Sequence, residues 1–237
     1  MEDLDFTSLE WSVSHHGRMI PTDGLSFADG PAILETVEYT IGVDDIVFGD
    51  ADGDGDTDAI VPVSALDVMG GGVDLGTAWY LWADEGGAAV QARVPAAVSN
   101  CDIVVESVTA VEGGIEIHEF HLRSGEETYT ACGEPGSDER TRTVTIGGDG
   151  PDGELWPVQT APFPSFGGAC PISVAFHADP ATTDHYPAPN AASAPLTGGQ
   201  INTWPVEEWQ IFRDGYPGWK LVGVNVDGNS GCAWTQL

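Results

Sequence analysis

The chain has 237 residues and a strong charge imbalance: 38 Asp and Glu stand against only 7 Lys and Arg, which gives a formal net charge of −31. Such a surface repels nucleic acid and anionic membranes, so neither is an expected partner, and it attracts divalent cations. It is also typical of the solvated acidic surface of secreted or salt-tolerant proteins. The 31 glycines and 16 prolines divide the chain into short segments, which favours strands and turns over helices.

Period-two alternation of apolar and polar residues, together with short apolar runs, predicts strands through the first two thirds of the chain. Turns containing glycine pairs separate them, and no amphipathic helix interrupts them. We therefore expect a mainly β protein with an antiparallel, sandwich-like domain over residues 1–148. The expected strands are 36–41, 45–48, 59–63, 78–82, 103–108, 114–122 and 141–146.

Between two of these strands lies a run of alternating aspartates, D-A-D-G-D-G-D-T-D, which begins at Asp50 and ends at Asp58. Calcium prefers six to eight hard oxygen ligands, and a tight loop supplies them by alternating side chains with turns. Gly55 permits the positive φ that wraps the chain around an ion. The sequence therefore predicts a calcium site, whose ligands are Asp50, Asp52, Asp54, Asp56 and Asp58.

The helical EF-hand is the main alternative for this loop, but it requires a bidentate acid at position 12. That position is Val61, within a β-branched run, so the loop is expected to join two strands. We expect the ion to stabilise the fold rather than to catalyse a reaction, because the predicted shell has no open position and no adjacent base. An acidic turn that binds no metal is the alternative interpretation.

Residues 45–61 resemble the calcium loops of integrin-type FG-GAP and VCBS-like repeats. In those families the loop recurs in every propeller blade, whereas here it occurs once, which favours an isolated loop on a sandwich. The resemblance implies secretion and often adhesion or glycan recognition. The N-terminal region is also similar to secreted or lipid-anchored actinobacterial proteins with one such loop and paired cysteines.

The sequence changes character near residue 150. Residues 1–150 hold 30 acids and 5 bases, whereas residues 151–237 hold 8 acids and 2 bases but 11 of the 16 prolines. We expect a linker over 149–168 and a smaller, disulfide-tied β or α+β unit over 169–237. Within that unit the patterns predict strands at 170–176 and 219–226 and a short helix at 205–213.

The four cysteines form no C-x-x-C pair, and their even number and wide spacing favour disulfides in an oxidising compartment. Three pairings are open by sequence. We favour Cys101 with Cys132 and Cys170 with Cys232, and free buried thiols are the alternative. The sequence has no membrane-spanning apolar run, and its start has no signal-peptide pattern. We therefore expect a secreted or cell-surface protein whose signal segment has been removed.

Five of the eight tryptophans lie after residue 150, four of them in the smaller unit. They are either exposed platforms for a glycan, with Trp204, Trp209 and Trp219 as candidates, or the core of a unit that has few aliphatic residues. We expect a calcium-stabilised binding protein without catalytic activity, whose partner is a glycan or another extracellular protein. An extracellular hydrolase of cell-wall or polysaccharide material and a structural envelope component are the alternatives.

Two weaker patterns have ordinary explanations. Residues 225–229 repeat the aspartate loop faintly, with amides in place of carboxylates, and a hairpin turn is the better interpretation than a second cation site. Glu119 and His121 share one face of a predicted strand and could hold a transition metal with a third ligand. A solvated strand face is the commoner explanation for such a pair.

Overall fold

The computed structural model describes residues 1–14, 22–123, 125–128, 130–148, 150–170, 179–197, 201–205 and 216–237. Within these ranges the chain is mainly β, with several antiparallel sheets and four short 3-10 helices. The expectation of a mainly β, sandwich-like fold is therefore confirmed. The short helices are η1 (Phe6–Ser8), η2 (Val43–Asp45), η3 (Glu126–Thr128) and η4 (Pro151–Gly153).

A seven-stranded sheet forms the first layer of the sandwich, with the order β3-β4-β6-β7-β8. Two further strands attach to its long central strands: β5 pairs with β6, and β9 pairs with β7. The strands are β3 (Ala32–Leu34), β4 (Val37–Ile41), β5 (Val47–Gly49), β6 (Asp58–Asp67), β7 (Val73–Asp84), β8 (Ala89–Gln91) and β9 (Ala97–Ser99).

A short N-terminal ribbon covers the outer face of this sheet. It consists of β1 (Glu10–Val13) and β2 (Thr22–Ser26), which pair antiparallel. Trp11 is 0% exposed, and its ring meets those of Tyr80 and Trp82 edge-on at centroid distances of 5.9 and 4.9 Å. The Trp11 indole N–H donates to the Phe6 carbonyl at 2.9 Å, so its polar atom is satisfied inside the core.

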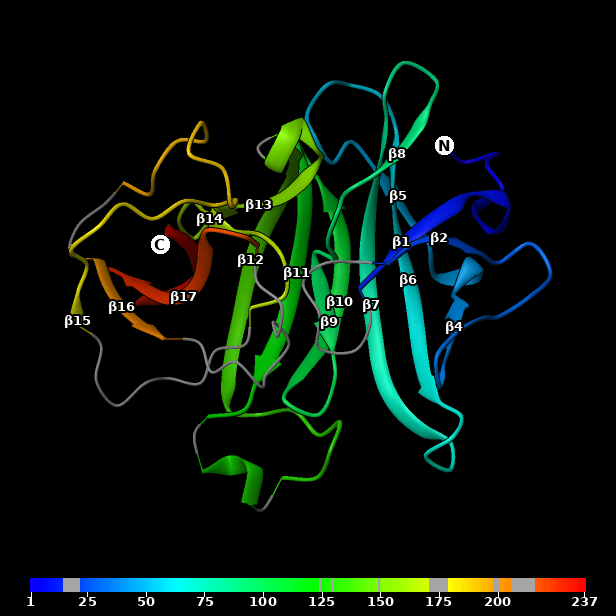
Figure 1. The fold of residues 1–237 in the computed structure, drawn as a ribbon, viewed down its shortest axis with the longest axis horizontal. Coiled ribbons are helices and arrows are strands. Elements are labelled where there is room, and N and C mark those ends of the chain that lie inside the picture. Colours follow the sequence, from blue (N-terminus) through cyan, green and yellow to red (C-terminus); the bar gives the residue numbers. More distant parts are fainter. Residues whose placement is uncertain are drawn as a thin grey trace.

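A five-stranded sheet forms the second layer, with the order β10-β11-β12-β13-β14, and in Figure 1 its long strands stand beside β6 and β7. Residues alternate strictly along β11, so that Ile115 and Ile117 are buried and Glu116 is exposed. The buried side chains pack against Ile60 and Leu81 of the seven-stranded sheet. The strands are β10 (Ile103–Val111), β11 (Gly114–His121), β12 (Asp138–Gly147), β13 (Trp156–Ala161) and β14 (Ser165–Phe166).

The range 149–168, which we expected to be a linker, contains β13 and β14. β13 pairs with β12, and β14 pairs with β13, so this segment extends the five-stranded sheet. Gly150 and Gly153 do lie in a turn, where Gly153 has a φ of 80°. The turn signals are therefore present, but the chain returns to the same sheet after them.

A four-stranded sheet completes the fold, with the order β15-β16-β17-β18. Its last two strands form a hairpin whose central residues, Asp227 and Gly228, have φ of 52° and 92°. Two positive φ values identify a tight turn of the hairpin type, as the hairpin interpretation of residues 225–229 predicts. The strands are β15 (Asp179–Pro180), β16 (Ile201–Pro205), β17 (Trp219–Val226) and β18 (Asn229–Gln236).

Both favoured disulfides are present. Cys101 pairs with Cys132 across 31 residues, and Cys170 pairs with Cys232 across 62 residues. The first joins two exposed loops beside the five-stranded sheet, and the second ties β18 to the segment after β14. In the chain-entropy description, each loop of this length contributes about 3–5 kcal/mol to stability.

The predicted strands at 36–41, 59–63, 78–82, 103–108, 114–122, 141–146 and 219–226 are confirmed as parts of β4, β6, β7, β10, β11, β12 and β17. The segment 45–48 divides between η2 and β5. The predicted helix at 205–213 and most of the predicted strand at 170–176 lie outside the described residues, as does Trp209.

Candidate metal centre

The aspartate loop connects β5 to β6. The two strands pair antiparallel, and Gly49 lies opposite Asp58, so the pairing brings both ends of the loop together. The connection is therefore a strand-to-strand loop, as the sequence predicts. Gly53 and Gly55 have φ of 84° and 96°, a region that favours glycine and that lets the loop fold back tightly.

Three carboxylates converge in this loop. Asp50, Asp52 and Asp58 each offer an oxygen, and the three oxygens lie within 4.8 Å of one another. Carboxylates at such distances repel unless a proton or a cation neutralises them. Hard oxygen ligands suit calcium or magnesium better than softer transition metals. The residues present therefore fit a hard divalent cation.

The pKa values of two of these acids are raised, as expected for crowded carboxylates. Partial burial raises the pKa of Asp52, and the neighbouring charges of Asp54 and Asp50 act in the same direction. Burial also raises the pKa of Asp58, to which the charges of Asp52 and Asp54 add. A bound cation would reverse these shifts, because it favours the ionised form of each carboxylate.

Hydrogen bonds within the loop fix the orientation of the aspartates. An Asp50 oxygen accepts from the Gly53 N–H at 2.7 Å, and an Asp52 oxygen accepts from the Asp54 N–H at 3.0 Å. An Asp54 oxygen accepts from the Asp56 N–H at 2.8 Å. Asp54 and Asp56 are exposed, and their part in metal binding stays a prediction.

Asp58 anchors the loop to the seven-stranded sheet. It is 0% exposed, and its two oxygens accept from the N–H groups of Ala51 at 2.7 Å and Asp84 at 2.9 Å. The Ala51 carbonyl in turn accepts from the Ile146 N–H at 3.0 Å and the Thr145 hydroxyl at 2.8 Å. Since Thr145 and Ile146 belong to β12, the loop joins the two layers of the sandwich.

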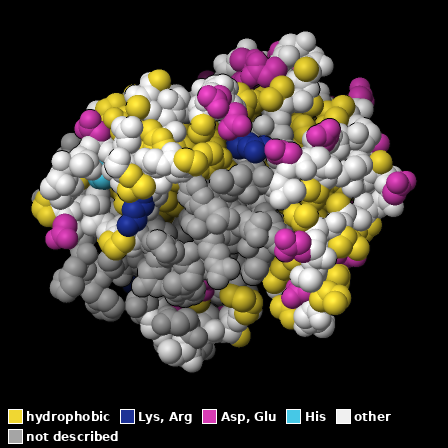
Figure 2. Space-filling model, viewed as in Figure 1, with side chains coloured by type: hydrophobic (Ala, Val, Ile, Leu, Met, Phe, Trp, Pro, Cys, Tyr) yellow, Lys and Arg dark blue, Asp and Glu magenta, His cyan; other side chains and the backbone are white. Residues whose placement is uncertain are grey.

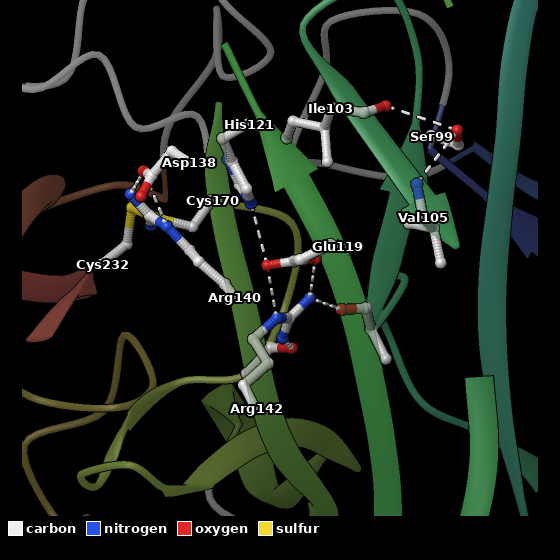
Figure 3. A network of polar contacts seen from close by, with 12 residues as sticks. Ser99, Ile103, Val105, Glu119, His121, Asp138, Arg140, Arg142, Cys170 and Cys232 are labelled. Atoms are coloured by element: carbon white, nitrogen blue, oxygen red, sulfur yellow. Dashed lines mark hydrogen bonds and ion pairs between the residues drawn. A yellow bond between two sulfur atoms is a disulfide. The ribbon is translucent and has the colours of Figure 1, made fainter. Parts of the chain in front are cut away.

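A second polar cluster lies at the end of the inward face of the five-stranded sheet (Figure 3). Glu119 accepts from the Arg142 Nε at 3.0 Å, and the His121 Nε2 lies 2.9 Å from the same carboxylate. Arg142 also donates to the carbonyls of Gly167 and Ala96, both at 2.7 Å. The cation beside the Glu119 and His121 pair is thus Arg142, and the arrangement does not resemble a transition-metal site.

Glu119 is an unusual acid because it is buried yet ionised. Burial by itself raises the pKa of Glu119, but the charges of Arg142 and His121 and their hydrogen bonds outweigh this and hold the pKa far below its ordinary value. A carboxylate in this state cannot donate a proton near neutral pH. Glu119 is therefore unsuited to the general-acid role in glycoside hydrolysis.

This cluster borders a cavity of about 260 Å³ between the five-stranded sheet and the β17–β18 turn. Its described lining includes Asp138 and Arg140, whose Nε donates to the Asp138 carboxylate at 3.0 Å beside the disulfide from Cys170 (Figure 3). Glu119 and Asp138 each have an arginine partner, and Glu139, which also lines the cavity, contacts His118. The pairing suits a polar structural junction better than a pair of catalytic carboxylates.

The structure places two of the three candidate tryptophans. Trp204 is 5% exposed, and its indole packs directly over Gly223, where an added Cβ would lie 2.1 Å from a ring atom. Trp156 and Trp234 are buried in the same core, in agreement with the core interpretation. Trp219 is half-buried and meets the Tyr186 ring edge-on at a centroid distance of 5.4 Å.

The chain was compared with known proteins at the level of families, sequences and structures. No protein-family model matches it, and no curated protein and no solved structure is significantly similar to it. Among the described residues, no helix is long and apolar enough to cross a bilayer.

Proposed function

We propose that the protein is a secreted or cell-surface binding protein that calcium stabilises and that has no catalytic activity. The convergence of oxygens from Asp50, Asp52 and Asp58 within 4.8 Å carries this proposal. An ion at this position neutralises the closest group of acids in the loop. It also fastens the loop to both layers of the sandwich through Asp58 and Ala51.

Calcium is the proposed ion because the ligands that the loop offers are carboxylate oxygens. Magnesium demands near-ideal octahedral geometry and usually keeps several waters, whereas calcium accepts irregular shells of six to eight oxygens. Backbone carbonyls, water and the exposed carboxylates of Asp54 and Asp56 would complete the shell. Extracellular calcium modules bind with dissociation constants of about 10⁻⁴–10⁻³ M, and we expect this range here.

The proposed location rests on the two disulfides and the acidic surface. Disulfides persist in oxidising compartments, which are also the compartments where calcium reaches the concentration that a weak site needs. Figure 2 displays acidic side chains over the described surface of one face, with few basic ones among them. Such a surface favours solubility and cation binding.

A glycan or another extracellular protein is the proposed partner. Of the candidate aromatic residues in the described part of the chain, Trp219 has exposed surface and stands next to Tyr186. Rings of this kind have an apolar body and a polar tip, which suits contact with a sugar or a protein surface. Trp219 is thus the described residue with which to test recognition.

Calcium binding is tested by removing divalent ions and adding calcium or magnesium back while the melting temperature and binding heat are measured. We expect calcium to raise the melting temperature more than magnesium does at equal concentration. Asp52→Asn should abolish most of the calcium response, whereas the matched control Asp29→Asn, on an exposed turn, should retain it. A melting temperature that changes neither on addition of chelator nor on addition of calcium would refute the calcium assignment.

Recognition is tested on a glycan array, with calcium present and with chelator present. We expect a calcium-dependent signal that Trp219→Ala weakens and that the buried-core variant Trp204→Phe retains as long as the protein stays folded. Calcium binding with no glycan signal would direct the search to extracellular proteins. Turnover of a polysaccharide without added enzyme would contradict the non-catalytic assignment.

A further inference from the structure

Three side chains from three adjacent strands meet on the outer face of the five-stranded sheet. His118 of β11 lies between two carboxylates: its Nδ1 is 2.5 Å from Glu106 of β10, and its Nε2 is 3.0 Å from Glu139 of β12. The imidazole is partly buried, with 25% of its side chain exposed, and the Phe120 ring lies 5.1 Å away. These contacts are distinct from the aspartate loop and do not depend on a bound metal.

The position of Glu106 results from a break in strand register. Val105 pairs with Glu119 and Ser107 pairs with His118. Glu106 is therefore an extra residue in β10 that has no opposite residue in β11. A bulge of this kind interrupts the ladder of hydrogen bonds and redirects a side chain. Here the redirected side chain is the one that reaches the His118 ring.

The two contacts together determine the chemical state of the ring. An ionised carboxylate only accepts hydrogen bonds, and a neutral imidazole has one donor and one acceptor nitrogen. Both contacts are favourable at once only when both ring nitrogens carry a proton. Loss of one proton leaves a nitrogen lone pair facing a carboxylate, so one of the two contacts becomes repulsive.

The other charged groups near the ring do not replace this proton. Glu116 lies two residues before His118 on β11, on the same face and exposed, and it adds a negative charge. Arg140 lies on the opposite face of β12, in phase with the buried Arg142, and pairs with Asp138. The charged side chains described on this face beside His118 are therefore acidic.

Strand β10 is the edge of its sheet and also touches the other layer. Its Ala110 packs against Gly49 of β5, where an added Cβ would lie 2.4 Å from the Ala110 Cβ. As an edge strand, β10 pairs with another strand on one side only, and the bulge weakens that side. On its other side, Ser99 and Asn100 bond to Ile103 and Val105 at the start of the strand, before Glu106. Side-chain contacts across the sheet therefore matter more for β10 than for an inner strand.

We propose that Glu106, His118 and Glu139 form a proton-dependent clasp that holds edge strand β10 to β11 and β12. The clasp is complete where the ring carries both protons and the carboxylates are ionised, because both ring nitrogens then donate to a carboxylate. It opens when the ring loses a proton, since one nitrogen lone pair then faces a carboxylate. The stabilisation is thus present only while the ring is doubly protonated.

The clasp is tested by amide hydrogen exchange of β10 at pH 5.5 and pH 8, with each rate divided by its intrinsic rate at that pH. In the full chain at constant calcium, we expect the protection of β10 amides to fall about two- to fivefold at the higher pH, as for partly exposed ion pairs. Protection of β17 amides serves as the internal reference. His118→Gln and Glu106→Gln should remove the pH dependence of β10, and the matched control Glu116→Gln should retain it.

A direct readout uses the ring N–H signals of His118 in ¹H–¹⁵N spectra at pH 5.5. We expect hydrogen-bonded N–H signals from both nitrogens in the wild type and loss of the Nδ1 signal alone in Glu106→Gln. A ring with a single N–H at pH 5.5 would overturn the proposal. So would β10 protection that is equal in wild type and His118→Gln at both pH values.

Discussion

The sandwich and the four-stranded sheet reach stability by different means. The sandwich has an aliphatic core between its layers, and at the margin of that core it buries charged groups, Asp58 in the loop and Glu119 with Arg142 at the sheet end. One face of the four-stranded sheet packs against a cluster rich in aromatic rings that contains a disulfide cysteine, and the other face packs a mainly aliphatic cluster around Val222, Val224 and Val226. Aromatic rings fill space and carry no charge that must be neutralised. The buried charges of the sandwich do have partners: Asp58 accepts from backbone N–H groups, and Glu119 pairs with Arg142.

This difference shows where each part is vulnerable. The sandwich depends on specific charge partners, and removal of a partner leaves an ion without compensation. The four-stranded sheet depends on shape and covalent closure, so it should respond to cavities and to reduction. The following predictions test this contrast, from the largest expected effect to the smallest.

Arg142→Met should destabilise the protein by about 3–5 kcal/mol, because it leaves Glu119 charged and buried without its main partner. Urea unfolding at pH 7 measures the change. The double variant Arg142→Met with Glu119→Gln should recover much of the loss, since the uncompensated charge is gone. Equal stability of the single and double variants would contradict the proposed importance of charge pairing in the sandwich.

Replacement of Cys170 and Cys232 by serine and alanine should cost about 4 kcal/mol, because the unfolded chain regains the freedom of a 62-residue loop. Hydrogen exchange should locate the loss first in β17 and β18. The matched control removes the Cys101–Cys132 bridge, which closes a loop of only 31 residues. Its removal should therefore cost slightly less stability. A larger loss in the control would show that the sandwich depends more on covalent closure than the four-stranded sheet does, and would contradict the contrast.

Removal of calcium should destabilise the sandwich by about 1.4–2.7 kcal/mol relative to a concentration 10 to 100 times the dissociation constant. The amides of Thr145 and Ile146 should lose protection, because their β12 segment is bonded to Ala51 of the loop. Amides of β17 should change less. Equal loss in both parts would mean that they unfold as one cooperative unit.

Acid should affect the C-terminal part through His185, which is 5% exposed and lies in the segment beside β18. Burial lowers the pKa of His185 below its ordinary value of 6.5, so the folded state binds this proton less readily than the unfolded state does. Stability should therefore fall as the pH is lowered below about 6.5. His185→Gln should flatten this part of the stability curve measured by urea unfolding, and an unchanged slope would contradict the assignment.

The sequence by itself determined a large part of this protein. Period-two alternation located most of the long strands, because one face of each strand is buried and the other is not. The aspartate spacing and the absence of an acid at Val61 identified a strand-to-strand loop. Cysteine number and spacing favoured the two pairings that the structure contains.

Some features were within reach of the same patterns but were not predicted. Arg142 is in phase with the buried Val144 and Ile146, and Glu119 is in phase with Ile115 and Ile117. The alternation therefore indicates two opposite charges on one inward face. That signal would have predicted a buried ion pair in place of a solvated strand face.

Only the tertiary structure decided the remaining features. The glycine-rich turn near residue 150 gave no sign that the chain would return to the same sheet, because strand partners are chosen by long-range packing and not by local composition. The burial of Trp204 depends on the missing side chain of Gly223 on a neighbouring strand. Likewise, spacing identified five aspartates, but only folding brought Asp50, Asp52 and Asp58 together, since strand pairing closes the loop and backbone N–H groups orient its carboxylates.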